Sequence, residues 1–243
     1  MKKIGSLFNI VSVLVTFLTL FGLLIALNRI NLIQQNVFDG FFNQRYLHLK
    51  QEMLIHVFFG LAYFILTPLL IINRVRNQSI KMHRFLGKIC LFSGLVLGIA
   101  SCVIHYRMTD GLLLEFNGWF SSLFFLLALT MAYVHVRKRN LFQHRAWMIR
   151  AYSMAIGAFV VVRVFSLVTF SAFTWIDLLA TNLVVTSPLE ISLIQSILFL
   201  SSWIGTIVPL LVGELIIKNK VNSEVRHGAK PKNESIILRA GTI

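Results

Sequence analysis

Hydrophobic residues fall into six long segments of the chain, separated by shorter polar stretches. Each segment is long enough to cross a hydrocarbon core of roughly 30 Å as a helix. Transmembrane β-strands would instead alternate polar and apolar residues over about ten positions, and the sequence shows no such segments. The pattern therefore predicts an all-α polytopic bundle of six transmembrane helices. They lie near Leu7–Leu27, Gln51–Ile72, Gly87–Tyr106, Gly118–Val136, Trp147–Phe170 and Ile191–Ile217.

The composition supports a membrane protein. The 243 residues are 57% hydrophobic and 13% charged, whereas soluble domains carry about 25% charged residues. This excludes a soluble enzyme, a disordered protein and a disulfide-rich secreted domain. Cys90 and Cys102 lie within one apolar segment, which predicts small packing residues and no disulfide. Residues 1–220 are predicted to form a single transmembrane domain, and residues 221–243 a mobile cytoplasmic tail.

Positive charges are distributed unevenly along the chain. It contains 23 Lys and Arg against nine Asp and Glu, which gives a formal net charge of +14. Most of the cations lie at the N-terminus, in the loops after spans two and four, and in the tail. Because cytoplasmic loops are enriched in Lys and Arg, we predict cytoplasmic termini in a bacterial cytoplasmic membrane. The charge then reflects topology and contact with the lipid bilayer, and nucleic-acid binding is not expected.

The two central hairpins repeat one another in sequence. At an offset of 61 residues, Val75-Arg76 aligns with Val136-Arg137, and His83-Arg84 aligns with His144-Arg145. The offset predicts that residues 51–106 and 118–170 are two copies of one helical hairpin. Sites commonly form where such copies meet.

The same motifs carry a family resemblance. His83-Arg84-Phe-Leu-Gly87 and His144-Arg145-Ala-Trp-Met-Ile-Arg150 occur between His56 and Arg163. Their order resembles a widespread bacterial multi-pass membrane-protein family that is known only as a domain of unknown function. The resemblance covers about residues 55–165 and implies a multi-helix inner-membrane protein, but it implies no established activity.

Polar residues near the outer ends of spans two, three and five form a candidate binding site. His56 lies about 8 Å inside span two, and Arg163 lies about 20 Å above the inner end of span five. His105 lies at the outer end of span three, and His48 and Glu52 precede His56 at four-residue spacing. A charge as deep as Arg163 needs a partner or water. Arg163 is therefore either a structural ion pair or an anchor for a haem propionate, a lipid phosphate or a substrate carboxylate.

Other polar residues leave alternatives open. His56 is either an interhelical hydrogen-bonding residue or an axial haem ligand, a proton relay or a metal ligand. Glu214 in span six is expected to pair with Lys218 one turn later. A group at the inner ends of spans three, four and five consists of interface anchors or of a second site, for a haem or a phosphate group. This group contains His83, Arg84, His135, His144 and Arg145.

Histidines at two depths of a helical bundle distantly resemble the layout of transmembrane cytochromes b. This resemblance implies haem b, with His56 and His105 as outer ligands, Arg163 as a propionate partner, and a redox partner or homo-oligomer. His83 and His105 are about 33 Å apart along span three, too far for two closely spaced haems. A cofactor-free transporter or small-ligand protein, and a structural or immunity-like protein, remain alternatives. No resident metal site is expected, and no motif identifies an enzyme.

Overall fold

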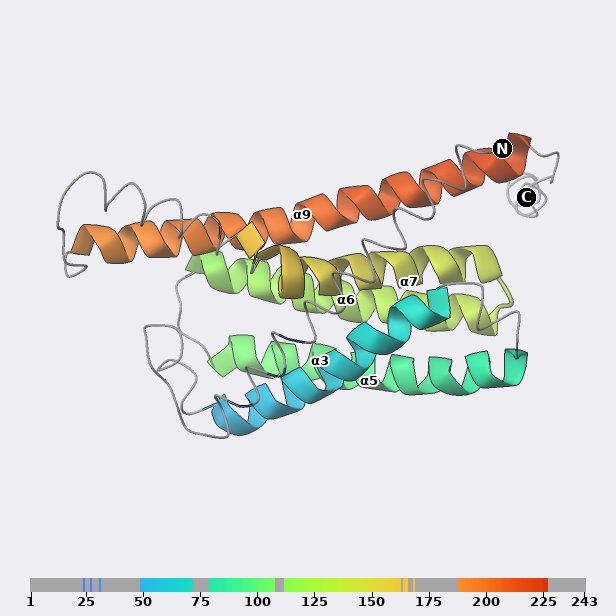
Figure 1. Ribbon diagram of the computed structural model, residues 1–243, viewed down its shortest axis with the longest axis horizontal. Helices are drawn as coiled ribbons and strands as arrows, with labels where there is room; N and C mark the ends of the chain where they lie inside the picture. The colour runs from blue at the N-terminus through green and yellow to red at the C-terminus, as the bar shows by residue number, and fades with distance from the viewer. Residues whose placement is uncertain are drawn as a thin grey trace, which may run out of the picture.

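A computed structural model describes residues 49–71, 79–107, 112–162 and 188–226, together with positions 24, 27, 31, 164, 165 and 168. Within these residues the chain is all-α. Its elements are α3 (Lys50–Ile71), α5 (Ile80–Arg107), α6 (Leu112–Arg137), α7 (Leu141–Ile156), the π-helix η2 (Gly157–Val161) and α9 (Pro188–Arg226), shown in Figure 1.

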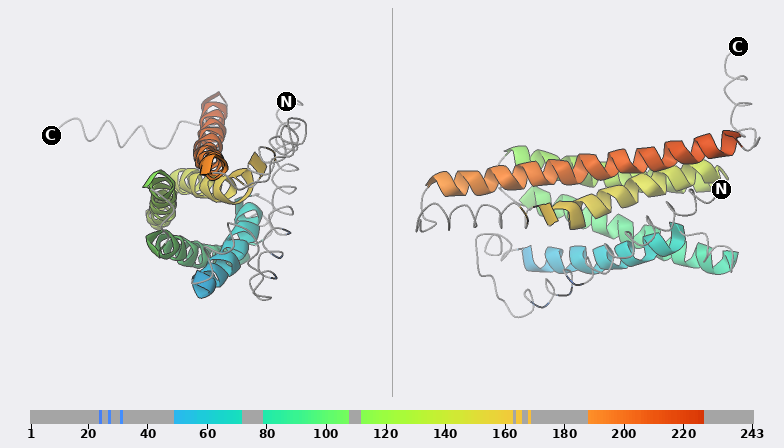
Figure 2. Two further views of the ribbon diagram at one scale, coloured as in Figure 1. Left: turned by 90° about the vertical axis from the view of Figure 1, so that its left-hand side faces the viewer. Right: turned by 45° about the horizontal axis from the view of Figure 1, so that its top comes forward.

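Helices α3, α5, α6 and α7 form a four-helix bundle. Helix α3 contacts α5 and α7, and α6 also contacts α5 and α7. The end-on view of Figure 2 shows the resulting arrangement, in which α3 lies diagonally opposite α6 and α5 lies diagonally opposite α7. Helix α9 packs outside this bundle, against α6, α7 and η2. The hairpins α3–α5 and α6–α7 are therefore neighbouring halves of one bundle.

Four of the described helices are long and apolar enough to cross a membrane. Large apolar side chains such as Phe58, Phe92 and Leu211 are exposed on their outer surfaces, as expected for helices that face lipid. The described spans are 50–70, 80–107, 115–137 and 199–219. They correspond to predicted spans two, three, four and six. Predicted span one, apart from Leu24 and Leu27, lies outside the described residues.

The helices extend beyond the predicted spans. Helix α5 begins at Ile80 and not near Gly87, and α6 begins at Leu112 and not near Gly118. Helix α9 continues through Arg226, so residues 221–226 of the predicted mobile tail are helical. Hydropathy marks the part of a helix that suits hydrocarbon, whereas capping side chains and turns determine where the helix begins.

Predicted span five is not one continuous α-helix, because α7 gives way to η2 after residue 156. The N–H of Val162 donates to the carbonyl of Gly157, five residues earlier. The backbone of Gly157 packs so closely on α9 that an added Cβ would lie 1.7 Å from the carbonyl oxygen of Gly205. That carbonyl is four residues before Pro209, which has no N–H to donate to it. The released carbonyl therefore lies against a glycine that leaves room for it.

The first turns of α5 and α7 are built alike. Ser79 Oγ accepts a hydrogen bond from the backbone N–H three residues later at 3.3 Å, and Asn140 Oδ1 does the same at 3.2 Å. His83 N–H donates to the Ser79 carbonyl, and His144 N–H donates to the Asn140 carbonyl, both at 3.0 Å. Each pair is separated by the 61 residues of the sequence offset. Helices α5 and α7 thus begin with the same capping arrangement.

Candidate functional site

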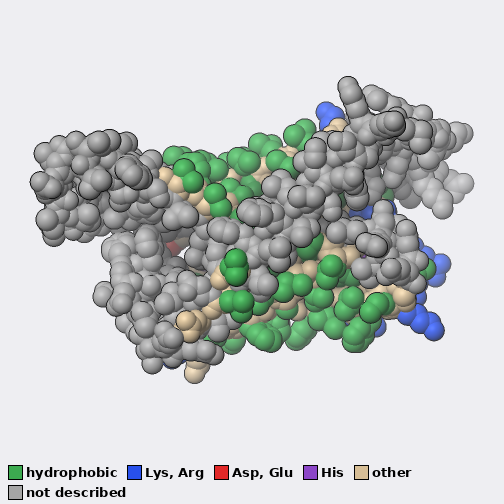
Figure 3. All heavy atoms as spheres, viewed as in Figure 1, with side chains coloured by type: hydrophobic (Ala, Val, Ile, Leu, Met, Phe, Trp, Pro, Cys, Tyr) green, Lys and Arg blue, Asp and Glu red, His purple; other side chains and the backbone are tan. Residues whose placement is uncertain are grey.

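Charged side chains gather at the two ends of the bundle. We call the end at which α5 and α7 begin and α6 ends the basic end, and the other the opposite end. Figure 3 shows Lys and Arg side chains at the basic end of the visible face. Described charged residues at the opposite end include Glu52, Arg107 and Glu115. Those at the basic end include Lys81, Arg84, Lys88, Arg137, Lys138, Arg139 and Arg145.

His56 lies on α3 near the opposite end and faces α5. Its Nδ1 is 3.1 Å from the hydroxyl oxygen of Ser101. The Ser101 hydroxyl donates to the Leu97 carbonyl at 2.9 Å, so its single proton is already used. His56 Nδ1–H is therefore the donor to Ser101, which places the imidazole lone pair on Nε2.

His105 lies one turn beyond Ser101 on α5 and packs against α6. A Cβ added to Gly118 would lie 2.3 Å from His105 Cε1, 2.4 Å from Nδ1 and 2.7 Å from Nε2. Glu115, on the preceding turn of α6, lies within electrostatic range of the ring. The structure therefore brings His56 and His105 to the same end of the α3–α5 hairpin, with His105 held in the space that the glycine leaves.

The candidate site near the outer ends of spans two, three and five also included Glu52, His48 and Arg163. Glu52 forms an ion pair with Arg107 across the α3–α5 interface. This pair gives the Glu52 carboxylate a structural partner at the end of the hairpin. Arg163 and His48 lie outside the residues that the structure describes.

His144 joins α6 to α7 at the basic end. Its Nδ1 donates to the carbonyl oxygen of Ala132 at 2.8 Å. A carbonyl only accepts, so the proton is on Nδ1 and the lone pair is on Nε2. Burial lowers the pKa of His144 below its usual value, the Ala132 hydrogen bond opposes this shift, and neighbouring His135 adds to it. His144 is therefore a neutral imidazole at neutral pH.

The other predicted inner residues lie at the same end. His83 is half-buried at the start of α5, on the helix diagonally opposite the one that carries His144. Arg84 is exposed, whereas Arg145 is half-buried. The structure thus brings the two His-Arg pairs to one end of the bundle, one pair on each hairpin.

The sequence interpretation missed the ion pair between Arg150 and Glu214. Glu214 was expected to pair with Lys218, but in the structure it binds Arg150 of α7. The reason is that α7 and α9 pack together and bring a guanidinium within reach of the carboxylate. The sequence did contain a signal for this ion pair. Arg150 and Glu214 each lie three positions inside the inner end of a predicted span, so their depths match.

The described polar residues can position imidazoles and join helices. Asn117 of α6 and Thr206 of α9 hydrogen-bond to each other through their side chains at 3.2–3.3 Å. Among the residues that the structure describes, no group of three His, Cys, Asp or Glu side chains could hold a metal ion. The candidate donors that the sequence singled out are imidazole nitrogens, and arginines lie at the basic end with His144.

Comparison with other proteins identifies a family for this chain and no individual relative. No curated protein and no solved structure matches the chain. A family model described as "Predicted membrane protein (DUF2306)" matches residues 53–217.

Proposed function

The chain belongs to this family of membrane proteins, and from that premise we propose that it binds haem through histidine ligands and transfers electrons. The observation that carries the proposal is the Nδ1 hydrogen bond of two imidazoles. His56 donates to Ser101, and His144 donates to the Ala132 carbonyl. Axial histidines are commonly oriented by such a bond, which leaves Nε2 as the coordinating nitrogen.

Because His83 and His105 are too far apart for two closely spaced haems, His56 and His144 would bind separate haems at opposite ends of the bundle. His56 is the seventh residue of α3, at the opposite end, and His144 is the fourth residue of α7, at the basic end. Fifteen residues separate His56 from the end of α3, or about 22 Å along the helix. We assign His105 as the second ligand near His56, with Arg163 as a propionate partner. His83 would be the second ligand near His144.

At the basic end, Arg84 and Arg145 supply positive charge for haem propionates. Bound haem iron would change between its ferric and ferrous states and carry one electron at a time. Such a protein needs an electron donor and an acceptor, either a separate redox partner or a second copy of the chain. We further propose six spans with both termini in the cytoplasm of a bacterium, because cations gather at the end where α6 meets α7.

A visible absorption spectrum tests the haem proposal. The detergent-purified chain, expressed with haem supplied, should show a Soret band and sharper bands after reduction with dithionite. We expect His56→Ala and His144→Ala each to remove part of the absorption. His227→Ala is the matched control, since His227 follows the last predicted span and belongs to neither candidate site. A colourless wild-type protein would overturn the proposal.

A second candidate function is a cofactor-free membrane protein, either a transporter for a small ligand or a structural, immunity-like protein. The observation that favours it is that polar side chains join helices in pairs. Glu52 binds Arg107, Asn117 binds Thr206, and Arg150 binds Glu214. Colourless protein that loses thermal stability when these pairs are broken would support this candidate. Substrate uptake by vesicles that contain the protein would then separate transport from a structural role.

A further inference from the structure

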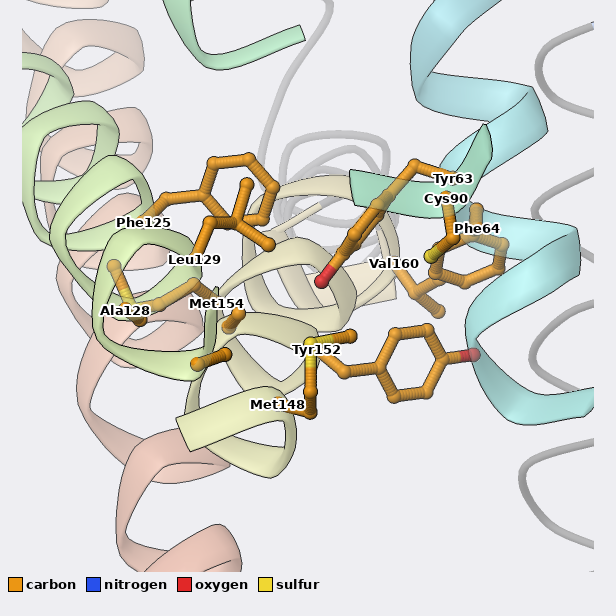
Figure 4. Close-up of a cluster of buried hydrophobic side chains, with 12 residues drawn as sticks. Tyr63, Phe64, Cys90, Phe125, Ala128, Leu129, Met148, Tyr152, Met154 and Val160 are labelled. Carbon is orange, nitrogen blue, oxygen red and sulfur yellow. The ribbon is translucent and has the colours of Figure 1, made fainter. Parts of the chain in front are cut away.

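The hydroxyl of Tyr63 is buried at the centre of the four-helix bundle. The Tyr63 side chain is 0% exposed, and its hydroxyl forms no hydrogen bond with any residue that the structure describes. Figure 4 shows the hydroxyl pointing toward the middle of the buried cluster, between Leu129 and Val160. Native proteins rarely leave a buried hydroxyl without a partner, and a water molecule or a ligand usually explains the exceptions.

The Tyr63 ring is held in this position from two sides. A Cβ added to Gly94 of α5 would lie 2.9 Å from Tyr63 Cδ2 and 2.7 Å from Leu129 Cδ1. The ring of Phe125 on α6 packs edge-on against it, with centroids 5.2 Å apart. Tyr63 therefore cannot turn its hydroxyl to the surface without losing these contacts. The unsatisfied donor is a consequence of how the bundle packs.

Two further polar groups lie in the same core. The Thr67 hydroxyl donates to the Tyr63 carbonyl at 2.7 Å, and Thr67 Oγ1 is 3.2 Å from Cys90 Sγ. Because the Thr67 proton is used, the Cys90 thiol donates to Thr67 Oγ1, which retains capacity for one more hydrogen bond. Thr67 and Cys90 both lie near the Tyr63 hydroxyl, although neither meets the geometry of a hydrogen bond to it. The core thus contains a donor at Tyr63 and an acceptor at Thr67.

We propose that the centre of the bundle is a binding site for one small neutral molecule, whose oxygen accepts a hydrogen bond from Tyr63 beside the Thr67–Cys90 pair. An ion does not suit this site, because the surrounding buried side chains, such as Met148, Met154 and Val160, are uncharged. The oxygen belongs either to an internal water molecule or to the carbonyl of a small apolar compound. Water would also donate to Thr67, which a carbonyl cannot do.

The Tyr63→Phe variant tests the site, because it removes the hydroxyl and keeps the ring. A hydroxyl without a partner is a cost to the folded protein, so its removal would leave the melting temperature unchanged or raise it. A hydroxyl bonded to a bound molecule stabilises the fold, so we expect the melting temperature of the detergent-purified chain to fall by about 2–4 °C. Tyr133→Phe is the matched control, since Tyr133 is exposed on α6. An unchanged or raised melting temperature would overturn the proposal.

Two measurements distinguish a water molecule from a carbonyl compound as the source of the oxygen. An isolated peak within hydrogen-bonding distance of Tyr63 Oη in a high-resolution experimental map would identify water. A compound released by denaturation and detected by mass spectrometry, but lost in Tyr63→Phe and retained in Thr67→Val, would identify a carbonyl ligand. The absence of both would overturn the proposal, whether or not the Tyr63 variant folds. None of these readouts depends on haem.

Discussion

The guanidinium of Arg150 binds the carboxylate of Glu214 through two hydrogen bonds, from Nε to Oε1 at 2.5 Å and from Nη2 to Oε2 at 3.0 Å. The same guanidinium lies over the ring of Trp147, with Cζ 4.5 Å from the centroid. In the His-Arg-x-Trp-Met-x-Arg motif, the tryptophan and the last arginine therefore act together. They join α7 to α9, whereas His144 at the start of the motif joins α7 to α6.

We expect Arg150→Gln to lower the free energy of unfolding by about 1–2 kcal/mol, because two charge-assisted hydrogen bonds are lost. Thermal unfolding in detergent measures the effect. The double variant Arg150→Gln/Glu214→Gln should cost less than the sum of the two single changes. Lys218→Gln is the control, since Lys218 was the partner expected from sequence. Strictly additive effects, or an equal loss in the Lys218 variant, would contradict the pairing.

Acid is expected to destabilise the haem-free protein through His144. Burial lowers the pKa of His144 below its ordinary value of 6.5. As the pH falls below about 6.5, the unfolded chain takes up a proton that the folded protein does not, so the free energy of unfolding decreases until the folded-state pKa is reached. Melting temperatures between about pH 8 and pH 5 should fall less in His144→Asn, whose side chain does not titrate. Equal falls in both proteins would rule out this role.

Two glycine substitutions should differ sharply. Gly157→Ala would place a methyl group 1.7 Å from the backbone oxygen of Gly205, so α9 must move, and we expect a loss of about 3 kcal/mol. Gly87→Ala meets nothing within 4 Å in the described structure and should stabilise α5 by about 0.5–1 kcal/mol. Yield and melting temperature of the two purified variants measure the difference. Similar behaviour of the two variants would show that the contact of η2 with α9 is not tight.

The two helix caps should be equivalent. Ser79→Ala and Asn140→Ala each remove the side-chain acceptor at the first turn of a helix, and each should cost about 1 kcal/mol. The exchanges Ser79→Asn and Asn140→Ser should be tolerated, because both residue types are good caps. Chemical unfolding of the four variants is the measurement. Intolerance of only one exchange would show that the two hairpins do not start in the same way.

Much of the helical core follows from hydropathy, because a helix that faces lipid must be apolar along the length that lipid covers. Predicted spans two, three, four and six each overlap a described helix. The interruption after residue 156 could not be predicted in this way, because Gly157 is surrounded by apolar residues in sequence. The interruption lies at a tertiary contact, where Gly157 meets the Gly205 carbonyl on another helix.

For the candidate site, the sequence predicted only how far along its helix each residue lies. Counting residues placed His56 near the outer end of its helix, but counting cannot say which helix a side chain faces. Ser101 as the partner of His56 depends on how α3 packs on α5. The bond from His144 to Ala132 depends on a tight turn in which Arg139 adopts a positive φ of 58°. Arginine rarely adopts this conformation, so the sequence did not indicate the turn.

The π-helical turn at Gly157–Val161 also changes how the two hairpins should be aligned. A π-turn contains one residue more than the α-helical turn it replaces, and one residue rotates the rest of the helix by about 100°. The offset of 61 that relates the starts of α5 and α7 therefore becomes 62 beyond this point, and the alignment needs a one-residue gap. With that gap, the counterpart of Ser101 is Arg163 and no longer Val162. The position that carries the hydrogen-bonding partner of His56 in one hairpin thus carries an arginine in the sequence of the other.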